Sequence, residues 1–460
     1  MKIKNICCIG AGYVGGPTMA VIALKCPEIK INVVDTNLKK IRCWNTKDLN
    51  KLPVFEPGLS KIISKTRNKN LFFSTKVEKA IDEADMIFMA VNTPTKTSGK
   101  GKGMAADLRF VKKCAMQIAK FSSSDKIVVE KSTLPVRTAE KIKDVLKKEN
   151  KNLNFEVLSN PEFLAEGTAI KDLFKSDRVL IGGDNTESGK IAVNSLVEIY
   201  NKWIPLDKII TTNVWSSELS KLASNAMLAQ RISSINSLSA FCEKTGAKID
   251  EVSNAVGKDH RIGPYFLKAS IGFGGSCFKK DILNLAYLCQ YYGLMEVADY
   301  WLQVIKINDY QKTRFSKKII DYMRKNKLKN VAILGWAFKK DTNDSRESAA
   351  IDVGFNLLMK GARLTIYDPM VNQNKILNDL TTYFKIKNID FNKKIKSKIF
   401  ICSSIDQAIN TSDVAAIITE WDQFKDYNWN KLSLIKYYMI FDGRNIIDEN
   451  IKTKLYKIGN

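Results

Sequence analysis

The chain has 460 residues, of which 45% are hydrophobic and 26% charged, a composition typical of a globular protein with about three domains. No apolar run approaches the roughly 18 residues that a membrane-spanning helix needs, which excludes a membrane span of that kind. The net charge of +25 favours polyanions in principle, but the basic residues are spread along the whole chain, which is more typical of a solvated surface than of a nucleic-acid site.

The number and spacing of the cysteines predict the cellular compartment. The chain has nine of them, an odd number, scattered and without a CxxC pair. Such usage is typical of a reduced cytoplasmic protein without a zinc site, and we expect no bound metal.

The N-terminal segment predicts a dinucleotide site. A short apolar strand runs directly into Gly10-Ala11-Gly12-Tyr13-Val14-Gly15, a GxGxxG motif followed by an apolar helix. Asp35 lies 20 residues beyond the last glycine, at the end of the next strand, where a carboxylate binds a ribose 2′-hydroxyl. We therefore expect NAD, although Lys40 also offers a cation to a 2′-phosphate. The alternative is a tight glycine turn with a capping aspartate.

The following segments alternate between strands and helices. Apolar runs at residues 31–35, 86–91, 127–130, 155–158 and 179–181 predict a doubly wound parallel sheet. Ligands bind at the carboxyl edge of such sheets, so we expect cofactor contacts at residues 91–95, where a strand ends. Glu162 and Glu166 follow another strand and project from the same edge; the alternative for each is a helix cap or a solvated side chain.

A long helix is predicted over residues 216–245, with Leu219, Leu222 and Met227 among the residues spaced for burial. Lys221 and Asn225 are four residues apart and share one face of it, as a functional pair or as an ordinary surface pair. A second mostly helical stretch covers residues 282–325 and completes a central connector.

Cys277 lies in a glycine-rich run, beside Lys279 and Lys280, whose charges would favour its thiolate. A cysteine is more often an inert buried side chain. His260 is the only histidine, so a classical Cys-His or Ser-His-Asp hydrolase would have to use it, and we expect it to be structural or at a subunit contact.

From about residue 326 the alternation of strands and helices begins again. The first turn there, at Gly335, lacks the second and third glycines of a dinucleotide motif, so we expect a different ligand. Residues 372–398 are rich in Lys and Asn and read as surface loop and weak helix. The sequence therefore predicts an α/β protein with two Rossmann-like doubly wound domains, residues 1–212 and 326–460, joined by a long central helix and helical connector, residues 213–325.

These motifs resemble the UDP-glucose/GDP-mannose dehydrogenase family block by block. The match follows the family order over nearly the whole chain and weakens only around residues 372–398. The matching blocks are residues 10–15, 91–95, 130–133, 160–167, 217–222, 272–281, 338–341 and 442–444.

The resemblance implies UDP-glucose 6-dehydrogenase activity, a four-electron oxidation of UDP-glucose to UDP-glucuronate with two NAD molecules in succession. In the implied mechanism, a water held by Asp281 and Thr133, near Lys221, takes the first proton. Cys277 then forms a thiohemiacetal and a thioester. The implied roles of the remaining groups are oxyanion stabilisation by Lys221 and Asn225, and activation of the hydrolytic water by Glu162.

The resemblance also implies binding residues. Those around NAD are Gly10, Ala11, Gly12, Tyr13, Val14, Gly15, Asp35, Lys40, Val91, Asn92, Thr93, Pro94, Thr95, Ser132, Thr133, Leu134, Glu166, Cys277, Lys280 and Arg346. Those around UDP-glucose are Glu162, Phe163, Leu164, Ala165, Glu166, Lys221, Asn225, Arg261, Phe266, Lys268, Phe273, Gly274, Phe338, Lys339 and Arg444. The family also implies a homo-oligomer, a dimer or a hexamer, in which Arg261 reaches a neighbouring subunit's substrate. We expect neither nucleic acid nor membrane as a partner.

Two residues depart from the family pattern, Lys40 in place of an Arg and Lys279 in place of a Gln or another polar residue. Rival substrates within the family are GDP-mannose and a UDP-N-acetylhexosamine. A rival of another class is a non-catalytic nucleotide-binding or RNA-binding protein that uses the +25 charge.

Overall fold

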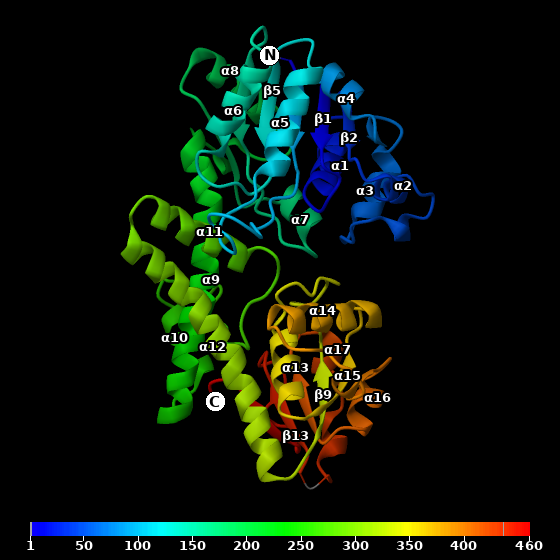
Figure 1. Cartoon of the computed structure of the whole chain (residues 1–460), viewed down its shortest axis with the longest axis vertical. Coiled ribbons are helices and arrows are strands. Elements are labelled where there is room, and N and C mark those ends of the chain that lie inside the picture. Colours follow the sequence, from blue (N-terminus) through cyan, green and yellow to red (C-terminus); the bar gives the residue numbers. More distant parts are fainter. Residues whose placement is uncertain (1, 436) are drawn as a thin grey trace. The chain divides into compact units, whose positions relative to one another are not determined.

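The computed structural model describes residues 2–435 and 437–460 (Figure 1). The chain forms two compact units, Met1–Ser224 and Asn225–Asn460, and each is described by itself. The expected division into three domains, with a separate one over residues 213–325, stays a prediction.

The first unit contains the predicted doubly wound sheet. Its eight strands have the order β3-β2-β1-β4-β5-β6-β7-β8, and all neighbours are parallel except β6 and β7, which are antiparallel. The strands are β1 Asn5–Ile9, β2 Lys30–Val34, β3 Leu71–Ser74, β4 Met86–Met89, β5 Lys126–Glu130, β6 Phe155–Ser159, β7 Val179–Gly183 and β8 Ile209–Asn213. Because β1 lies centrally and β2 and β4 flank it, the glycine turn after β1 opens at the point where the strand order reverses.

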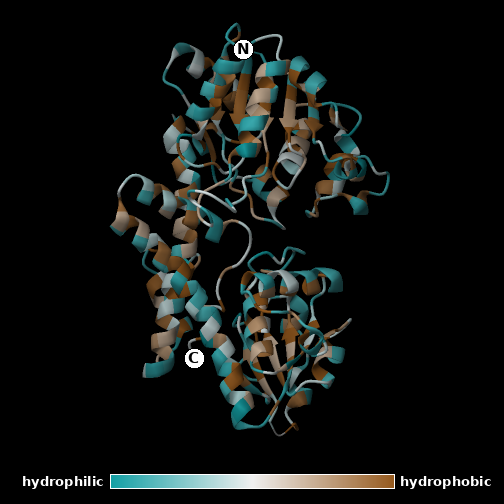
Figure 2. Ribbon diagram, in the orientation of Figure 1, coloured by the Kyte–Doolittle hydropathy of each residue, from teal (hydrophilic) through white to brown (hydrophobic). Residues whose placement is uncertain are grey.

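Helices cover both faces of this sheet, as the order of strands and helices requires. Each face has its own apolar core, and the strands between them are almost continuously hydrophobic (Figure 2). One face carries α4 Val77–Glu83, α5 Arg109–Phe121 and α6 Thr138–Glu149; the other carries α1 Gly15–Lys25, α3 Leu59–Thr66, α7 Ala169–Phe174 and α8 Glu187–Tyr200, while α2 Leu38–Trp44 follows β2.

The predicted long helix is α9, Val214–Thr245, and the boundary between the units falls within it. It ends at Gly246, whose φ of 82° is the left-handed conformation that glycine adopts at helix ends. The expected burial pattern is wrong at two positions, since Leu219 is 43% and Met227 62% exposed. These side chains lie on a face of α9 that nothing in this single chain covers among the described residues.

The second unit continues with helices and then a parallel sheet. The helices before the sheet are α10 Ile249–Gly257, α11 Phe278–Tyr291 and α12 Met295–Lys325, and the break between the last two contains Gly293 at φ 77°. Six strands follow in the order β11-β10-β9-β12-β13-β14, with bounds β9 Asn330–Leu334, β10 Arg363–Tyr367, β11 Ile399–Ile401, β12 Val414–Ile417, β13 Met439–Asp442 and β14 Lys454–Lys457. The remaining helices are α13 Ala349–Met359, α14 Gln373–Ile386, α15 Lys393–Lys396, α16 Ile405–Asn410 and α17 Asp422–Lys425.

One stretch of the second unit is more regular than its composition predicts. Residues 373–386, expected as loop and weak helix, form the 14-residue helix α14, which buries Ile376, Leu380 and Phe384. The four-residue spacing of these side chains is one helical stripe, and burial of that stripe outweighs the polar composition around it.

The turn after β9 differs from the turn after β1, since Ala337 and Lys340 stand where the dinucleotide motif has its second and third glycines. Trp336 follows Gly335 directly, as Ala11 follows Gly10, and it is fully buried, with its indole N–H donating to Asp379 Oδ2 at 3.1 Å. No helix among the described residues is long and apolar enough to cross a bilayer.

Replacing Trp336 by Ala is expected to lower the free energy of unfolding of the second unit by about 3–5 kcal/mol, because a fully buried indole leaves a cavity. Chemical denaturation followed by circular dichroism measures this. Leu434→Ala is the control, since Leu434 is 94% exposed and its loss should change stability by less than about 0.5 kcal/mol. Equal effects of the two variants would contradict the account of this turn.

Candidate active site

The glycine turn after β1 has the geometry of a dinucleotide cradle. Gly10 has φ 114°, and a Cβ there would lie 2.2 Å from the Ala90 carbonyl oxygen. A Cβ on Gly15 would lie 2.0 Å from the Gly10 carbonyl oxygen, whereas one on Gly12 would meet nothing within 4 Å. The outer glycines are therefore required by close packing, and the middle one leaves open space beside the start of α1. That space fits a pyrophosphate against the backbone.

Asp35 stands after β2, where it shapes this cradle. Its carboxylate accepts the backbone N–H of Ala11 at 3.1 Å and that of Asn37 at 2.9 Å, and it accepts Lys40 Nζ at 2.7 Å. Burial alone would raise the pKa of Asp35, but the bond from Lys40 and the two backbone N–H groups outweigh it, and the pKa lies below its usual value. The carboxylate is thus ionised and held in place to accept a ribose hydroxyl.

Two further loops meet at the carboxyl edge of the sheet. Ser132 Oγ donates to the Val91 carbonyl at 2.6 Å, and Thr93 Oγ1 donates to the Thr133 carbonyl at 3.1 Å. These bonds bring the predicted cofactor residues of both loops together. Leu134 is different, since it is 4% exposed and its side chain packs into the core.

Glu162 and Lys221 form a largely buried ion pair in the first unit. Lys221 Nζ lies 3.7 Å from Glu162 Oε1, and the side chains are 6% and 10% exposed, respectively. Lys221 also lies over the ring of Phe163, at 5.2 Å from its centroid. Glu162 Oε2 is buried and meets no donor among the described residues. The pair therefore offers a cation and an unsatisfied carboxylate oxygen side by side.

Two residues that hold the loop of Glu162 and Glu166 were not among the predicted site residues. Glu56 is 5% exposed and accepts the backbone N–H of Gly167 at 2.8 Å and that of Ala169 at 3.0 Å, at the start of α7. Lys131 donates to Asn160 Oδ1 at 3.0 Å, and burial lowers its pKa to about 8. Both contacts join residues far apart in the chain, so no local motif could have revealed them.

In the second unit, Cys277 is exposed at the N-cap position of α11. The positive end of a helix dipole favours a thiolate there. The expected help from neighbouring lysines is reduced, since Lys279 Nζ bonds Glu347 at 2.9 Å and Lys280 Nζ lies 3.8 Å from Asp281 Oδ1.

Asp281 lies one turn along α11 from Cys277 and is 2% exposed. Its Oδ2 accepts Asn225 Nδ2 at 2.6 Å, so the structure brings together two residues predicted to act on the same substrate. Lys221 and Asn225 remain one turn apart on the continuous helix α9.

The glycine-rich loop before Cys277 packs against predicted substrate residues of the same unit. The Gly275 N–H donates to the Arg346 carbonyl at 2.8 Å, and a Cβ on Gly275 would come within 2.9 Å of the Phe338 ring. Arg444 Nη2 donates to the Phe338 carbonyl at 2.8 Å. Phe273 is 7% exposed and is held by Asn308, whose Oδ1 accepts its N–H at 2.8 Å. The thiol loop and these predicted substrate residues thus form one assembly.

Other predicted residues lie away from this assembly on the surface of the second unit. Arg261 is exposed and bonds Asp259 at 2.6 Å, and His260 beside it is exposed. Phe266 is 44% exposed with φ 61°, and Lys268 is exposed. Their roles in binding stay predictions.

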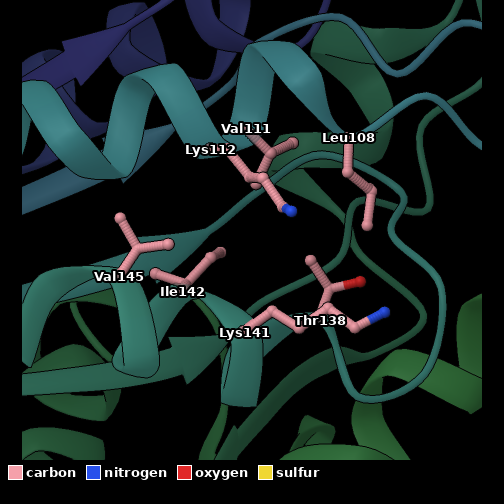
Figure 3. A pocket seen from close by; sticks show the side chains of 7 residues that line it. All are labelled: Leu108, Val111, Lys112, Thr138, Lys141, Ile142 and Val145. Atoms are coloured by element: carbon pink, nitrogen blue, oxygen red, sulfur yellow. The ribbon is translucent and has the colours of Figure 1, made fainter. Parts of the chain in front are cut away.

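Two cavities of the first unit lie apart from the predicted residues. The groove between α5 and α6 is lined by Leu108, Val111, Lys112, Thr138, Lys141, Ile142 and Val145 (Figure 3). Its volume of about 10 Å³ holds at most one water. A shallow hollow of about 550 Å³ lies at the ends of β7 and β8, around Asp184, Lys190 and Thr212. Neither is lined by a residue predicted to bind cofactor or substrate.

An open glycine cradle with an ionised acid after the second strand defines a dinucleotide-dependent dehydrogenase of the α/β class. The whole length of the chain then gives the family. Residues 4–204 match the NAD binding domain, residues 215–310 the central domain and residues 332–449 the UDP binding domain of the UDP-glucose/GDP-mannose dehydrogenase family. The chain belongs to this family, and its cofactor is NAD.

Relatives with assigned activities match over nearly their whole length. The chain is 54% identical to UDP-glucose 6-dehydrogenase 3 of Arabidopsis thaliana, with 99% of this chain and 95% of the relative covered. It is 55% identical to UDP-glucose 6-dehydrogenase of Drosophila melanogaster, with 99% and 94% covered. Among solved structures, a UDP-glucose dehydrogenase from Pyrobaculum islandicum matches with a TM-score of 0.83 and 27% identity, over 99% of this chain and 97% of that one.

Replacing Asp35 by Ser is expected to weaken the preference for NAD over NADP. The variant removes the negative charge that repels a 2′-phosphate and releases Lys40 to pair with that phosphate. We expect the ratio of kcat/KM for NAD to that for NADP to fall by about 10–100-fold, which corresponds to about 1.4–2.7 kcal/mol. Initial rates with each cofactor measure it.

Lys39→Met is the matched control for Asp35→Ser, because Lys39 is an exposed neighbour on α2. It should leave the ratio within about twofold, as exposed charges contribute little. An unchanged ratio in Asp35→Ser would show that this carboxylate does not select the cofactor.

Proposed function

We propose that the chain is a UDP-glucose 6-dehydrogenase that oxidises C6 of UDP-glucose to the carboxylate of UDP-glucuronate through a covalent intermediate on Cys277. The observation that carries the proposal is an exposed thiol at the start of α11, packed with the residues of a UDP-binding domain, in a chain that also has an open NAD cradle. NAD, when bound, accepts one hydride in each of two oxidations, so that one UDP-glucose, two NAD⁺ and one water give UDP-glucuronate, two NADH and three protons.

The first oxidation needs a base for the C6 hydroxyl proton as its hydride leaves. Thr133 and Asp281 orient the water that takes this proton, and the Lys221 ammonium stabilises the developing alkoxide. The burial of Asp281 and of Lys221, which are 2% and 5% exposed, supports these roles, because charges act most strongly where water is excluded.

The second oxidation needs a tetrahedral carbon that carries an oxyanion. Cys277 Sγ attacks the aldehyde carbon, a C–S bond forms and the carbonyl oxygen becomes the alkoxide of a thiohemiacetal. Lys221 Nζ and Asn225 Nδ2 stabilise that oxygen. Loss of the second hydride then leaves a thioester on Cys277.

Hydrolysis of the thioester needs an activated water. Glu162 Oε2, which meets no donor among the described residues, takes a proton from water while the new C–O bond forms. The C–S bond then breaks, and the thiolate takes up a proton to restore Cys277. Lys221 Nζ, 3.7 Å from Glu162 Oε1, holds the carboxylate in place for this step.

We also propose that copies of the chain associate through the central helices, as a dimer or a hexamer. Large apolar side chains of α9 are exposed there, with Met227 at 62%, Phe241 at 67% and Leu238 at 44%. We place the enzyme in the cytoplasm, because its nine cysteines are odd in number, scattered along the chain and without a CxxC pair.

The function is tested by stoichiometry. The wild-type protein is expected to form two NADH per UDP-glucose, and Cys277→Ser to form no UDP-glucuronate, because a serine hydroxyl is too weak a nucleophile to capture the aldehyde. NADH absorbance with chromatography of the nucleotide sugars measures both. Cys402→Ser is the control, since Cys402 is a half-buried free cysteine of the same unit.

Two outcomes would contradict this proposal. Two NADH per UDP-glucose from Cys277→Ser would exclude the thioester. Turnover by the wild type only with GDP-mannose or with a UDP-N-acetylhexosamine would assign a different substrate.

Glu162→Gln is expected to lower kcat by at least about 100-fold and to trap the thioester, since the amide cannot take the proton of the hydrolytic water. Intact-protein mass spectrometry should then find the glucuronyl adduct on Cys277. Glu156→Gln is the matched control, because Glu156 lies on β6, just before the same loop. A loss of rate without any adduct would place Glu162 in an earlier step.

A further inference from the structure

Two buried carboxyl groups of the first unit face each other and take no part in the proposed reaction. Glu130 ends β5 and is 1% exposed, and Glu218 lies near the start of α9 and is 2% exposed. Burying a carboxyl group costs free energy unless partners satisfy it. The partners of these groups therefore indicate what they stabilise.

Glu218 caps helix α6, which has no side-chain cap of its own. Arg137, the N-cap residue of α6, has φ 69°, an uncommon conformation for a residue other than glycine. Glu218 Oε2 accepts the Arg137 N–H at 2.6 Å, and Oε1 accepts the Ala139 N–H at 2.8 Å. A carboxylate in this place satisfies N–H groups that the helix leaves unpaired and interacts favourably with its dipole.

Glu130 joins Glu218 to the end of β5. No N–H or hydroxyl of the described residues donates to either oxygen of Glu130, and its side-chain hydrogen bond is with Glu218. Such a bond requires a proton between the two groups. Burial raises the pKa of Glu130 well above its usual range and that of Glu218 to about 7, although backbone N–H groups of Ala139 and Arg137 act to lower the latter. The proton therefore lies on Glu130, and Glu218 carries the charge.

The other charged groups around this pair belong to α6 and its partners. Lys143 favours the ionised form of Glu130, but its ammonium is bonded to Asp184. The Arg137 guanidinium is bonded to Glu140 at 2.7 Å. Both cations are thus paired with other carboxylates, so the pKa values of Glu130 and Glu218 stay raised.

Glu218 consequently holds both ends of one loop. Residues 131–137 join β5 to α6, and Glu218 contacts Glu130 before this loop and Arg137 at its end. The loop carries Ser132 and Thr133. Glu218 also lies three residues before Lys221, a spacing that places the two on neighbouring positions of one helix surface.

We propose that Glu218, together with Glu130, is a positioning residue of the dehydrogenase reaction, which clamps the loop of Ser132 and Thr133 to the turn of α9 that carries Lys221. The inference rests on the proposed function, in which Thr133 and Lys221 act in the same step. A clamp of this kind matters because a displacement of about 1 Å at a catalytic group costs about 100-fold in rate.

The first test is Glu218→Gln in the full-length protein. The amide keeps one acceptor oxygen but turns its NH₂ toward the second backbone N–H, so one cap bond is lost. We expect kcat to fall by about 10–100-fold while the KM for UDP-glucose changes by less than about threefold, because the predicted UDP contacts lie on other loops. Glu140→Gln is the matched control, since it removes the same charge from an exposed position on α6 and should leave kcat unchanged.

The second test is Glu130→Gln, whose amide donates to Glu218 without needing a proton. In the wild type, the pKa values of Glu130 and Glu218 are higher in the folded than in the unfolded protein. The pair therefore contributes fully to stability below the unfolded pKa of about 4.5, and this contribution is lost as the pH rises through about 7 and above. The melting temperature of Glu130→Gln relative to wild type should therefore rise between about pH 5 and pH 9. The alkaline fall of kcat should likewise move to higher pH in this variant.

Hydrogen exchange separates this inference from the proposed function. Glu218→Gln should speed amide exchange in residues 131–139 without any substrate, whatever sugar the enzyme uses. Wild-type inactivity with UDP-glucose together with faster exchange in the variant would contradict only the proposed function. Unchanged exchange, or faster exchange with kcat within twofold of wild type, would overturn the positioning role. Identical pH profiles of Glu130→Gln and wild type would overturn the part assigned to Glu130.

Discussion

Acidic side chains that accept pairs of backbone N–H groups hold the loops of both sheets in place. Parallel sheets put their functional loops at one edge, where strands end and helices begin with unpaired N–H groups. In this chain Glu56 supplies the acceptors for α7 and Glu218 those for α6. Both helices lack a side-chain cap from their own N-cap residue. Because a distant residue provides the cap, each loop is fixed to another part of the unit.

The same device takes a different form in each of the two sheets. Asp35 and Asp368 both follow the second strand of their sheets and both accept N–H groups from the turn after the first strand. Asp35 faces an open turn at Gly12 and has Lys40 as its charged partner. Asp368 Oδ2 instead accepts two backbone N–H groups and the Trp421 indole, and Oδ1 accepts two more backbone N–H groups. Its acceptors serve the fold, and none is set aside for a ribose.

The features that could be predicted from the sequence are those encoded by residues close together in the chain. The glycine cradle, the acid 20 residues after it and the alternation of strands and helices are local patterns, and the structure has each of them. The caps by Glu56 and Glu218 join residues 111 and 79 positions apart, so periodicity carries no trace of them. The exposure of Met227 was not predicted for a related reason: the spacing of apolar residues on a helix does not show whether the same chain covers that face. The charge expected near Cys277 was overestimated, because Glu347, the partner of Lys279, is distant in sequence.

Because the chain has a single histidine, its buried acidic side chains also bear on how protons are transferred. His260 is the single histidine and is exposed, so the proposed proton transfers use carboxyl groups and lysines, whose ordinary pKa values lie far from neutral pH. Burial brings the pKa values of such groups closer to neutral pH: within the first unit it lowers the pKa of Lys131 to about 8 and raises the pKa of Glu218 to about 7. Burial also destabilises charge, so each such group must be paired or bonded to the backbone. The polar network that caps the helices is therefore the condition under which an enzyme of this composition can keep ionisable groups inside its fold.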